Sequence, residues 1–213
     1  MKEIDQWKSV RRYQQKQIES EKVREILEAA RRAPSWQNLQ PWHFLVIESA
    51  EGKEKLAEIC ATGKIVKYSP VCIALFGDTS GFDKNKSIKS VHDLMENKMT
   101  QDQVADYLDN PLASPEHGRD NIILARLLEQ VSYAASFMIL KAKQLGIGSC
   151  VLGGVENSLT TISDKYDEVR QFFNIPEKFE MLALVTLGYS DENEKLRSRK
   201  DLDDVVSYEK VNS

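Results

Sequence analysis

The chain has few cysteines to form disulfides or bind structural metals, and it has no long apolar run of the kind that crosses a membrane. Its 213 residues include only three cysteines, Cys60, Cys72 and Cys150, whose spacing fits neither a disulfide framework nor a C-x-x-C metal or redox site. We therefore expect reduced cysteines that pack in the interior. The N-terminus lacks the apolar run of a signal peptide, and no stretch approaches the roughly 18 apolar residues that span a bilayer. These absences predict a cytoplasmic protein.

The sequence also lacks an excess of one charge and any histidine cluster. Lys and Arg number 29 and Asp and Glu 33, which gives a net charge of -4 and a pI near 5.5. This balance offers no general attraction to nucleic acid or to an anionic membrane. His92 and His117 have no cysteine, histidine or carboxylate partners at ligand spacing. We therefore expect no metal, no nucleic-acid partner and no membrane partner.

What the chain does contain is enough apolar sequence for one sizeable core. Hydrophobic residues make up 41% of it, and no repeat or low-complexity linker interrupts it, so we predict a single domain over residues 1–213. Apolar spacing of three and four residues predicts helices over 20–32, 54–60, 124–142 and 164–173. Ser20 is placed to cap the first helix, and the third is long enough to be a central buried helix. Apolar runs predict strands over 43–47, 71–76 and 181–187.

Residues 33–42, with the sequence APSWQNLQPW, join the first predicted helix to the first predicted strand. Pro34 and Pro41 restrict the backbone and withhold N–H donors, whereas Ser35, Asn38 and Gln40 offer polar groups that no helix or strand period requires. The pattern predicts a rigid, polar and accessible junction loop. An ordinary turn is the alternative interpretation of this segment taken alone.

Cationic segments lie near both ends of the chain. The first, residues 7–13, contains Lys8, Ser9, Arg11 and Arg12, and the second contains Lys195, Arg197, Arg199 and Lys200. Charged donors combined with a hydroxyl suit phosphate recognition. Basic runs are more often solvated surface, so each segment alone leaves both interpretations open.

Two other stretches bear on function. Residues 145–148 (LGIG) follow the long helix, and an apolar run leads from them to Gly153 and Gly154, where the backbone could approach a flat ligand closely. The G-x-G follows a helix and does not open one after a strand, so it is not a Rossmann fingerprint. Residues 79–120 are polar, with weak helical patterns over 90–97 and 102–108, and are a candidate lid over a site.

Four segments in this order resemble the FMN-dependent nitroreductase family: residues 8–11, the loop 33–42, residues 145–154, and residues 184–189 followed by Arg199 and Lys200. The resemblance spans nearly the whole chain. It implies an α+β fold, a three-layer sandwich in which helices flank a mixed, mostly antiparallel sheet. It also implies an intertwined homodimer with two FMN sites at the subunit interface.

The resemblance assigns cofactor-binding roles by position. Phosphate and ribityl contacts would come from Lys8, Ser9, Arg11, Arg197 and Arg199. Pro34, Ser35 and Asn38 would reach the flavin from the other subunit, with Gln40 in the same loop, and Leu152, Gly153 and Gly154 would line the ring system. The chain departs from the family at Trp7, where many members have arginine, and at Gly153, where some have an acid. The loss of one charged phosphate contact costs about 1.5 to 3 kcal/mol unless another group replaces it.

The implied activity is the reduction of nitroaromatic, quinone or similar flat acceptors by NAD(P)H, with ping-pong kinetics. The cofactor carries that chemistry, so no catalytic side chain is assigned. Three alternatives stay open: specialised flavin chemistry such as reductive dehalogenation or flavin fragmentation, a flavin-binding protein without turnover, and a scaffold without flavin.

Overall fold

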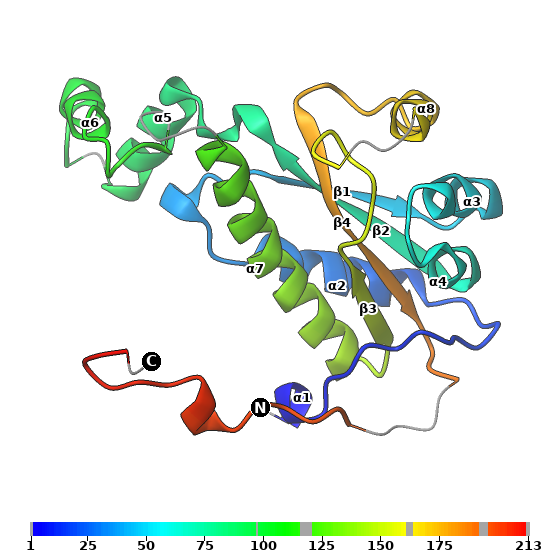
Figure 1. Ribbon diagram of the computed structural model, residues 1–213. Coiled ribbons are helices and arrows are strands. Elements are labelled where there is room, and N and C mark those ends of the chain that lie inside the picture. Colours follow the sequence, from blue (N-terminus) through cyan, green and yellow to red (C-terminus); the bar gives the residue numbers. More distant parts are fainter. Residues whose placement is uncertain (1, 97, 116–120, 161–163, 192–195, 212–213) are drawn as a thin grey trace.

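One antiparallel sheet forms the centre of the molecule (Figure 1). The computed structural model describes residues 2–96, 98–115, 121–160, 164–191 and 196–211. The strands lie in the order β1-β2-β4-β3, with bounds β1 (Trp42–Ile47), β2 (Val71–Asp78), β4 (Phe179–Gly188) and β3 (Gly148–Leu152). Every neighbouring pair of these strands is antiparallel, and a parallel bridge joins Ser9 to Ser149 at the β3 edge. The predicted α+β fold with a mixed, mostly antiparallel sheet is confirmed.

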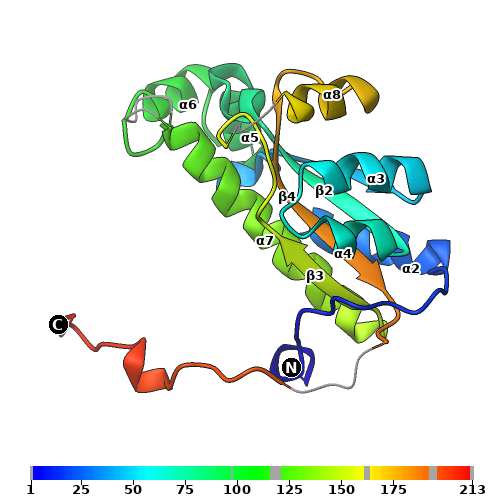
Figure 2. The same ribbon diagram turned by 45° about the vertical axis from the view of Figure 1, so that its right-hand side comes forward.

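Helices cover both faces of the sheet (Figures 1 and 2). One face carries α2 (Ser20–Arg31) and α7 (Ile122–Gln144), and the other carries α3 (Ala50–Glu58), α4 (Gly63–Tyr68) and α8 (Lys165–Phe172). The remaining helices are α1 (Lys2–Asp5), α5 (Lys84–Leu94), α6 (Gln101–Leu108) and the short 3-10 turns η1 (Trp36–Asn38), η2 (Thr79–Phe82) and η4 (Leu202–Asp204). The arrangement is the three-layer sandwich that the sequence predicts.

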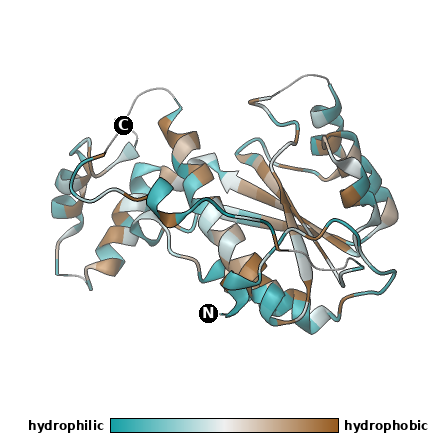
Figure 3. Ribbon diagram, turned by 60° about the horizontal axis from the view of Figure 1, so that its bottom comes forward, coloured by the Kyte–Doolittle hydropathy of each residue, from teal (hydrophilic) through white to brown (hydrophobic). Residues whose placement is uncertain are grey.

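Alternation along β2 divides the interior into two apolar clusters. Ile73 and Leu75 belong to the cluster with α2 and α7, whereas Cys72 and Phe76 belong to the cluster with α3, α4 and α8. Successive side chains of a strand point to opposite faces, so a central strand that is apolar at every position is buried on both sides. Figure 3 shows the strands among the hydrophobic parts of the ribbon. None of the three cysteines forms a disulfide with a described residue, and all three are buried in the second cluster.

The long helix α7 is buried on one side only. Gln130, Ala134 and Met138 are inaccessible or nearly so, but Tyr133 and Phe137 are 41% and 42% exposed. The predicted central buried helix therefore packs one face into the core and leaves the other face exposed in the single chain. By length and hydropathy α7 could cross a membrane, but it packs here against α2 and β2. The helix ends at Gln144, and the φ of 74° at Gly146 just beyond it lets the Ile147 N–H reach the Ala142 carbonyl at 2.8 Å.

Three local predictions need correction. Ser20 is the first residue of α2, not its cap, and its hydroxyl donates to the Glu21 carboxylate at 3.1 Å. The helix predicted over 54–60 begins four residues earlier, because the Ser49 hydroxyl accepts from the Gly52 N–H at 3.2 Å. Both α4 and β3 carry no sequence signal strong enough to have been assigned. Helix α4 depends on a close approach: a Cβ at Gly63 would lie 2.3 Å from the Ala57 carbonyl oxygen.

The polar excursion after β2 forms a helical pair, α5 and α6, with a small core of its own built from Val91, Val104, Leu108 and Ala113. A capping box at Thr100 and Gln103 starts α6. The two weak helical patterns therefore mark real helices, with α5 beginning earlier than predicted. His92 lies in α5, and His117 lies outside the described residues.

Candidate functional site

The N-terminal cationic segment is fastened to the edge of the sheet. The Val10 N–H donates to the Ser149 carbonyl at 2.9 Å, and the Trp7 indole N–H donates to the Ser149 hydroxyl at 3.3 Å. The buried Tyr13 hydroxyl lies 2.7 Å from the Val10 carbonyl and 2.8 Å from the Thr186 hydroxyl. This docking fixes the direction of residues 7–13 relative to β3 and β4.

Lys8 lines a small cationic pocket at this junction. The pocket has a volume of about 140 Å³ and is lined by Trp7, Lys8, Val10, Lys143, Gly146, Ile147, Gly148, Ser149 and Ser190. Lys8 is only 8% exposed, and its ammonium makes no ion pair or hydrogen bond with any described residue. An ammonium that faces a pocket without a described counter-charge attracts negative groups, so the pocket is suited to an anion. Ser149, Ser190 and Lys143 were not among the sequence candidates, because only the fold brings them to Lys8.

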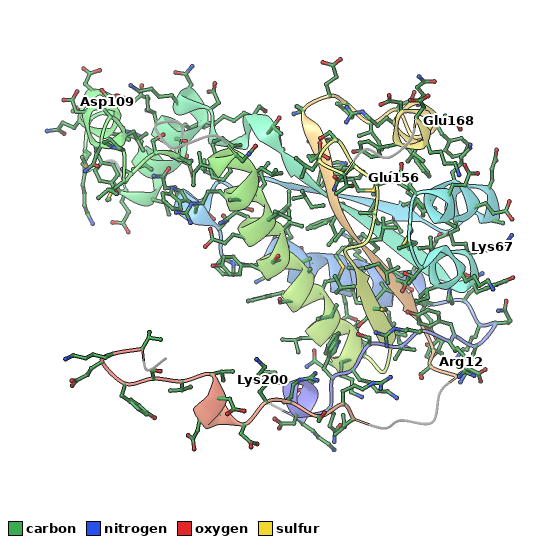
Figure 4. The ribbon with its side chains drawn as sticks, viewed as in Figure 1. Arg12, Lys67, Asp109, Glu156, Glu168 and Lys200 are labelled. Atoms are coloured by element: carbon green, nitrogen blue, oxygen red, sulfur yellow. The ribbon has the colours of Figure 1, made fainter. Side chains whose placement is uncertain are left out.

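The other cationic candidates lie at the surface. Arg11 is exposed, and its guanidinium donates to the Ser9 carbonyl at 3.4 Å. Arg197 and Arg199 are exposed on the C-terminal tail, where Arg199 donates to the adjacent Ser198 carbonyl at 3.3 Å. The tail runs beside α1 in both views, and Lys200 is next to that helix in Figure 4. The fold thus brings the two cationic segments to the same end of the molecule. Lys195 lies outside the described residues.

The junction loop 33–42 has an unusual backbone. Gln37, Asn38 and Gln40 have φ angles of 48°, 54° and 49°, a left-handed conformation that costs free energy for residues other than glycine. The Ser35 hydroxyl accepts from the Gln40 N–H at 3.0 Å, and the Gln40 amide donates to the Asn38 side chain at 3.2 Å. Pro34, Asn38 and Gln40 are exposed. Strain held in place by specific hydrogen bonds is typical of functional loops.

Neighbouring helices hold this loop from both sides. The Trp36 N–H donates to the side chain of the buried Gln130 on α7 at 2.6 Å. The Gln37 side chain donates to the Ala113 carbonyl at 2.7 Å, and the Ser90 hydroxyl donates to the Gln37 carbonyl at 2.5 Å. The excursion that contains α5 and α6 therefore supports the loop directly.

Two buried donors beside the loop lack an acceptor among the described residues: the Trp36 indole N–H and the Arg126 Nε–H. The Arg126 guanidinium lies 4.5 Å from the centre of the Trp36 ring and pairs with Glu129 at 3.0 Å. The hydrogen bond from Arg126 is the main cause that lowers the pKa of Glu129 below its ordinary value. Because Glu129 offsets the charge of Arg126, the two free donors suit a polar oxygen better than a full anion.

The glycine pair lies where the chain leaves β3. Space above Gly153 is open, since a Cβ placed there would meet nothing within 4 Å, whereas a Cβ at Gly154 would lie 3.3 Å from Ala61. The side chain of Leu152 packs into the second apolar cluster, so only its backbone faces outward; Val151 is the exposed neighbour, at 38%. Residues 59–61 border the two glycines. The sequence alone did not predict this contact, because the two segments are far apart in the chain.

The pieces of the site thus fall into two groups. Residues 7–11, Ser149 and the glycine pair lie along β3, and the fold of one chain brings them together. The loop 33–42 is held separately, against α5 and α7, and none of the contacts above joins it to Lys8 or Gly153.

Comparisons with known proteins agree over almost the entire chain. The sequence profile described as "Nitroreductase family" matches residues 4–189. A Methanothermobacter thermautotrophicus protein with the provisional name NADH dehydrogenase/NAD(P)H nitroreductase is 27% identical over 196 residues, which cover 92% of this chain and 80% of the relative.

Solved structures show the same fold. A nitroreductase family protein from Streptococcus pneumoniae TIGR4 superimposes with a TM-score of 0.77 at 24% identity, covering 97% of this chain and 98% of the other. A provisionally named nitroreductase from Exiguobacterium sibiricum 255-15, solved in complex with FMN, has a TM-score of 0.76 at 24% identity, with 98% and 96% coverage.

Proposed function

The chain belongs to the nitroreductase family and is an oxidoreductase, and from this premise we propose that it binds FMN and uses NAD(P)H to reduce nitroaromatic, quinone or similar flat acceptors. Bound FMN would take a hydride from NAD(P)H and pass reducing equivalents to the acceptor, in two half-reactions that share one site. The FMN-bound relative and the provisional name of the methanogen relative support this choice of cofactor and donor.

The single observation that carries the proposal is the pocket at Lys8. An ammonium without a described partner, in a pocket also lined by Lys143, Ser149 and Ser190, has the chemistry to hold a phosphate. The open space above Gly153 allows a flat ring system to approach the backbone. The residues present therefore fit FMN, with Trp7 donating to Ser149 where relatives of this family often have an arginine.

In this proposal each candidate has a defined role. Lys8, Ser9, Arg11, Arg197 and Arg199 hold the phosphate and ribityl oxygens. The backbone of residues 152–154 lines the ring, and Pro34, Ser35, Asn38 and Gln40 reach the flavin of the partner subunit. No side chain of this set transfers a proton or forms a covalent bond, so binding and orientation are the contribution of the protein.

We propose a homodimer, because a single chain leaves apolar surface uncovered. On α7, Leu128, Tyr133 and Phe137 are 41–43% exposed, and on the tail Leu202 and Tyr208 are 71% and 86% exposed. Apolar surface on a long helix and on an extended arm is typical of obligate interfaces between copies of a chain. The same proposal places the protein in the cytoplasm, with no nucleic-acid or membrane partner.

The α5 and α6 segment bears on the acceptor. We propose that residues 79–120 belong to the single domain 1–213 and border the acceptor site. The Ser90 hydroxyl of this segment donates to the Gln37 carbonyl, so the segment would hold the loop 33–42 in place beside the acceptor.

The test is the visible absorption spectrum of the purified protein after FMN is added and excess removed, followed by anaerobic addition of NADH or NADPH. Retained flavin bands that bleach with either nucleotide are the expected result. Flavin that binds but does not bleach would favour specialised chemistry or binding without turnover. A colourless protein would contradict the FMN assignment.

A further inference from the structure

A buried carboxylate on β4 supports the loop that follows the glycine pair. Glu180 is 7% exposed and lies across from residues 155–160. The Ser158 N–H donates to one oxygen of the Glu180 carboxylate at 3.0 Å, and the Ser158 hydroxyl donates to the other oxygen. No described lysine, arginine or histidine pairs with Glu180, so Ser158 supplies the hydrogen bonds that this buried group requires.

Asn157 makes a second connection between the same loop and the same strand. Its amide donates to the Met181 carbonyl at 2.9 Å, and its side-chain oxygen accepts from the N–H groups of Leu159 and Thr160 at 3.0 and 3.1 Å. Asn157 is 6% exposed. The loop is thereby tied to two consecutive residues of β4.

The glycine pair lies between this attachment and the end of β3. On its other side the Ala61 N–H donates to the Gly154 carbonyl at 2.8 Å, and the Glu156 N–H donates to the Ile59 carbonyl at 2.8 Å. Two successive glycines have no side chains with which to anchor themselves, and their backbone is the most flexible of any residue pair. The position of their N–H groups therefore depends on contacts made by the residues after them.

We propose that Glu180, through Ser158, is a positioning residue that holds the Gly153 and Gly154 N–H groups toward bound FMN. The inference rests on the proposed function, because it needs the flavin ring to lie against the glycine pair. The two hydrogen bonds from the N–H and O–H of Ser158 to the Glu180 carboxylate fix the orientation of Ser158. A neutral side chain in place of the carboxylate would bind Ser158 less strongly and would leave the loop freer to rotate.

Glu180→Gln and Ser158→Ala test the role. Ser158→Ala removes the hydrogen bond from the hydroxyl, and Glu180→Gln leaves one acceptor oxygen for the two Ser158 donors. Each change therefore removes one hydrogen bond, and FMN binding should weaken about 5- to 10-fold. The midpoint potential of the bound FMN should shift in both variants, because an N–H directed at the ring interacts unequally with its oxidised and reduced forms. The double variant should bind FMN no more weakly than the more impaired of the two single variants, since both changes disrupt the same interaction between Ser158 and Glu180.

Glu168→Gln is the matched control. Glu168 lies on α8, exposed, and pairs only with Lys55 among the described residues, so the same change of charge there should leave affinity and potential unaltered. Amide exchange of residues 153–160 in the apoprotein should accelerate in both test variants and not in the control. If stability falls but the potential and FMN affinity stay at their original values, Glu180 supports only the fold. If the parent protein binds no FMN, the proposed function fails first.

Discussion

The two cationic segments assigned to one anion differ in how the chain holds them. Residues 7–14 are bonded to β3 through Val10, to β4 through Tyr13, and to Tyr189 just after β4 through Gln14, with Tyr13 buried at 7%. Residues 196–211 are exposed throughout, and Tyr208 and Val211 stand 86% and 91% in solvent. Figures 1 and 2 show the tail extending away from the sheet.

This difference teaches which half of the site one chain can build alone. The N-terminal segment gains its position from backbone and buried side-chain bonds within the protomer. The tail has apolar side chains but no surface of its own chain to bury them. We therefore expect the N-terminal half of the phosphate site to be formed in each subunit, and the tail half to be ordered only on dimerisation.

The largest effect should come from breaking the docked segment. Tyr13→Ala removes a buried ring and three hydrogen-bond contacts, and should lower the free energy of unfolding by about 3–5 kcal/mol. Tyr13→Phe keeps the ring and should cost about 1 kcal/mol. Urea unfolding followed by circular dichroism measures both. Tyr208→Ala on the tail is the control, and an equal loss there would contradict the contrast between the segments.

Arg11→Ala and Arg199→Ala compare the two segments as FMN ligands. Each arginine is exposed, so neither change should unfold the protein, and each should weaken FMN binding by about 1.5–3 kcal/mol. Fluorescence titration of the apoprotein gives the affinities. When dilution dissociates the dimer, Arg199→Ala and the parent should have the same FMN affinity. Arg11→Ala should still bind FMN more weakly than the parent. Unchanged affinity in both variants would remove the phosphate-site assignment.

Ser35→Ala tests the third element of the site, the strained loop. The Gln40 N–H would lose its acceptor, which should cost about 1 kcal/mol of stability. Flavin retention after desalting should fall in the dimer, because the loop is proposed to reach the partner's cofactor. A monomeric form that retains FMN as well as the dimer does would oppose the shared site.

The smallest effect concerns pH where the tail leaves the sheet. Tyr189 donates to Glu19 at 2.6 Å, and this bond, the largest cause, together with backbone and Lys22 hydrogen bonds lowers the pKa of Glu19 to about 2. A lowered pKa means a contribution to stability that is full above the ordinary value of 4.5 and is lost as pH falls toward 2. Glu19→Gln should flatten that part of the unfolding profile slightly, since the group is exposed and screened. If the stability of Glu19→Gln falls more steeply with decreasing pH than that of the parent, Glu19 does not make this contribution.

Much of the architecture follows from local pattern. The runs at 71–76 and 181–187 have the continuous apolar character of strands covered on both faces, and both are central in the sheet. The helical pattern of apolar residues in α7 extends over enough residues to distinguish a helix from a strand. In contrast, α4 is only six residues long and depends on the close approach of Gly63 to α3, which the local pattern does not show. Ser20 has the residue type of an N-cap, but Glu19 occupies the N-cap position of α2.

The candidate site was less accessible to such reasoning. Leu152 is proposed to line the ring through its backbone, because strand alternation turns its side chain into the core and leaves Val151 outside. Ser149, Lys143 and Ala61 come to the site across sequence distances that no short motif records. The same holds for Glu180, which follows Ser158 by 22 residues and reaches it because β4 returns beside the loop.

The sequence by itself determined the order of the main helices and strands and the residue types able to hold an anion, because these depend on composition and short-range periodicity. The family followed from the resemblance of four short motifs. Only the tertiary structure decided that Lys8 is buried beside Lys143 and two hydroxyls, that the loop 33–42 is strained and supported by α5 and α7, and that one face of α7 is left exposed. Those features arise from contacts between distant segments, and their free energy is defined only once the chain has packed.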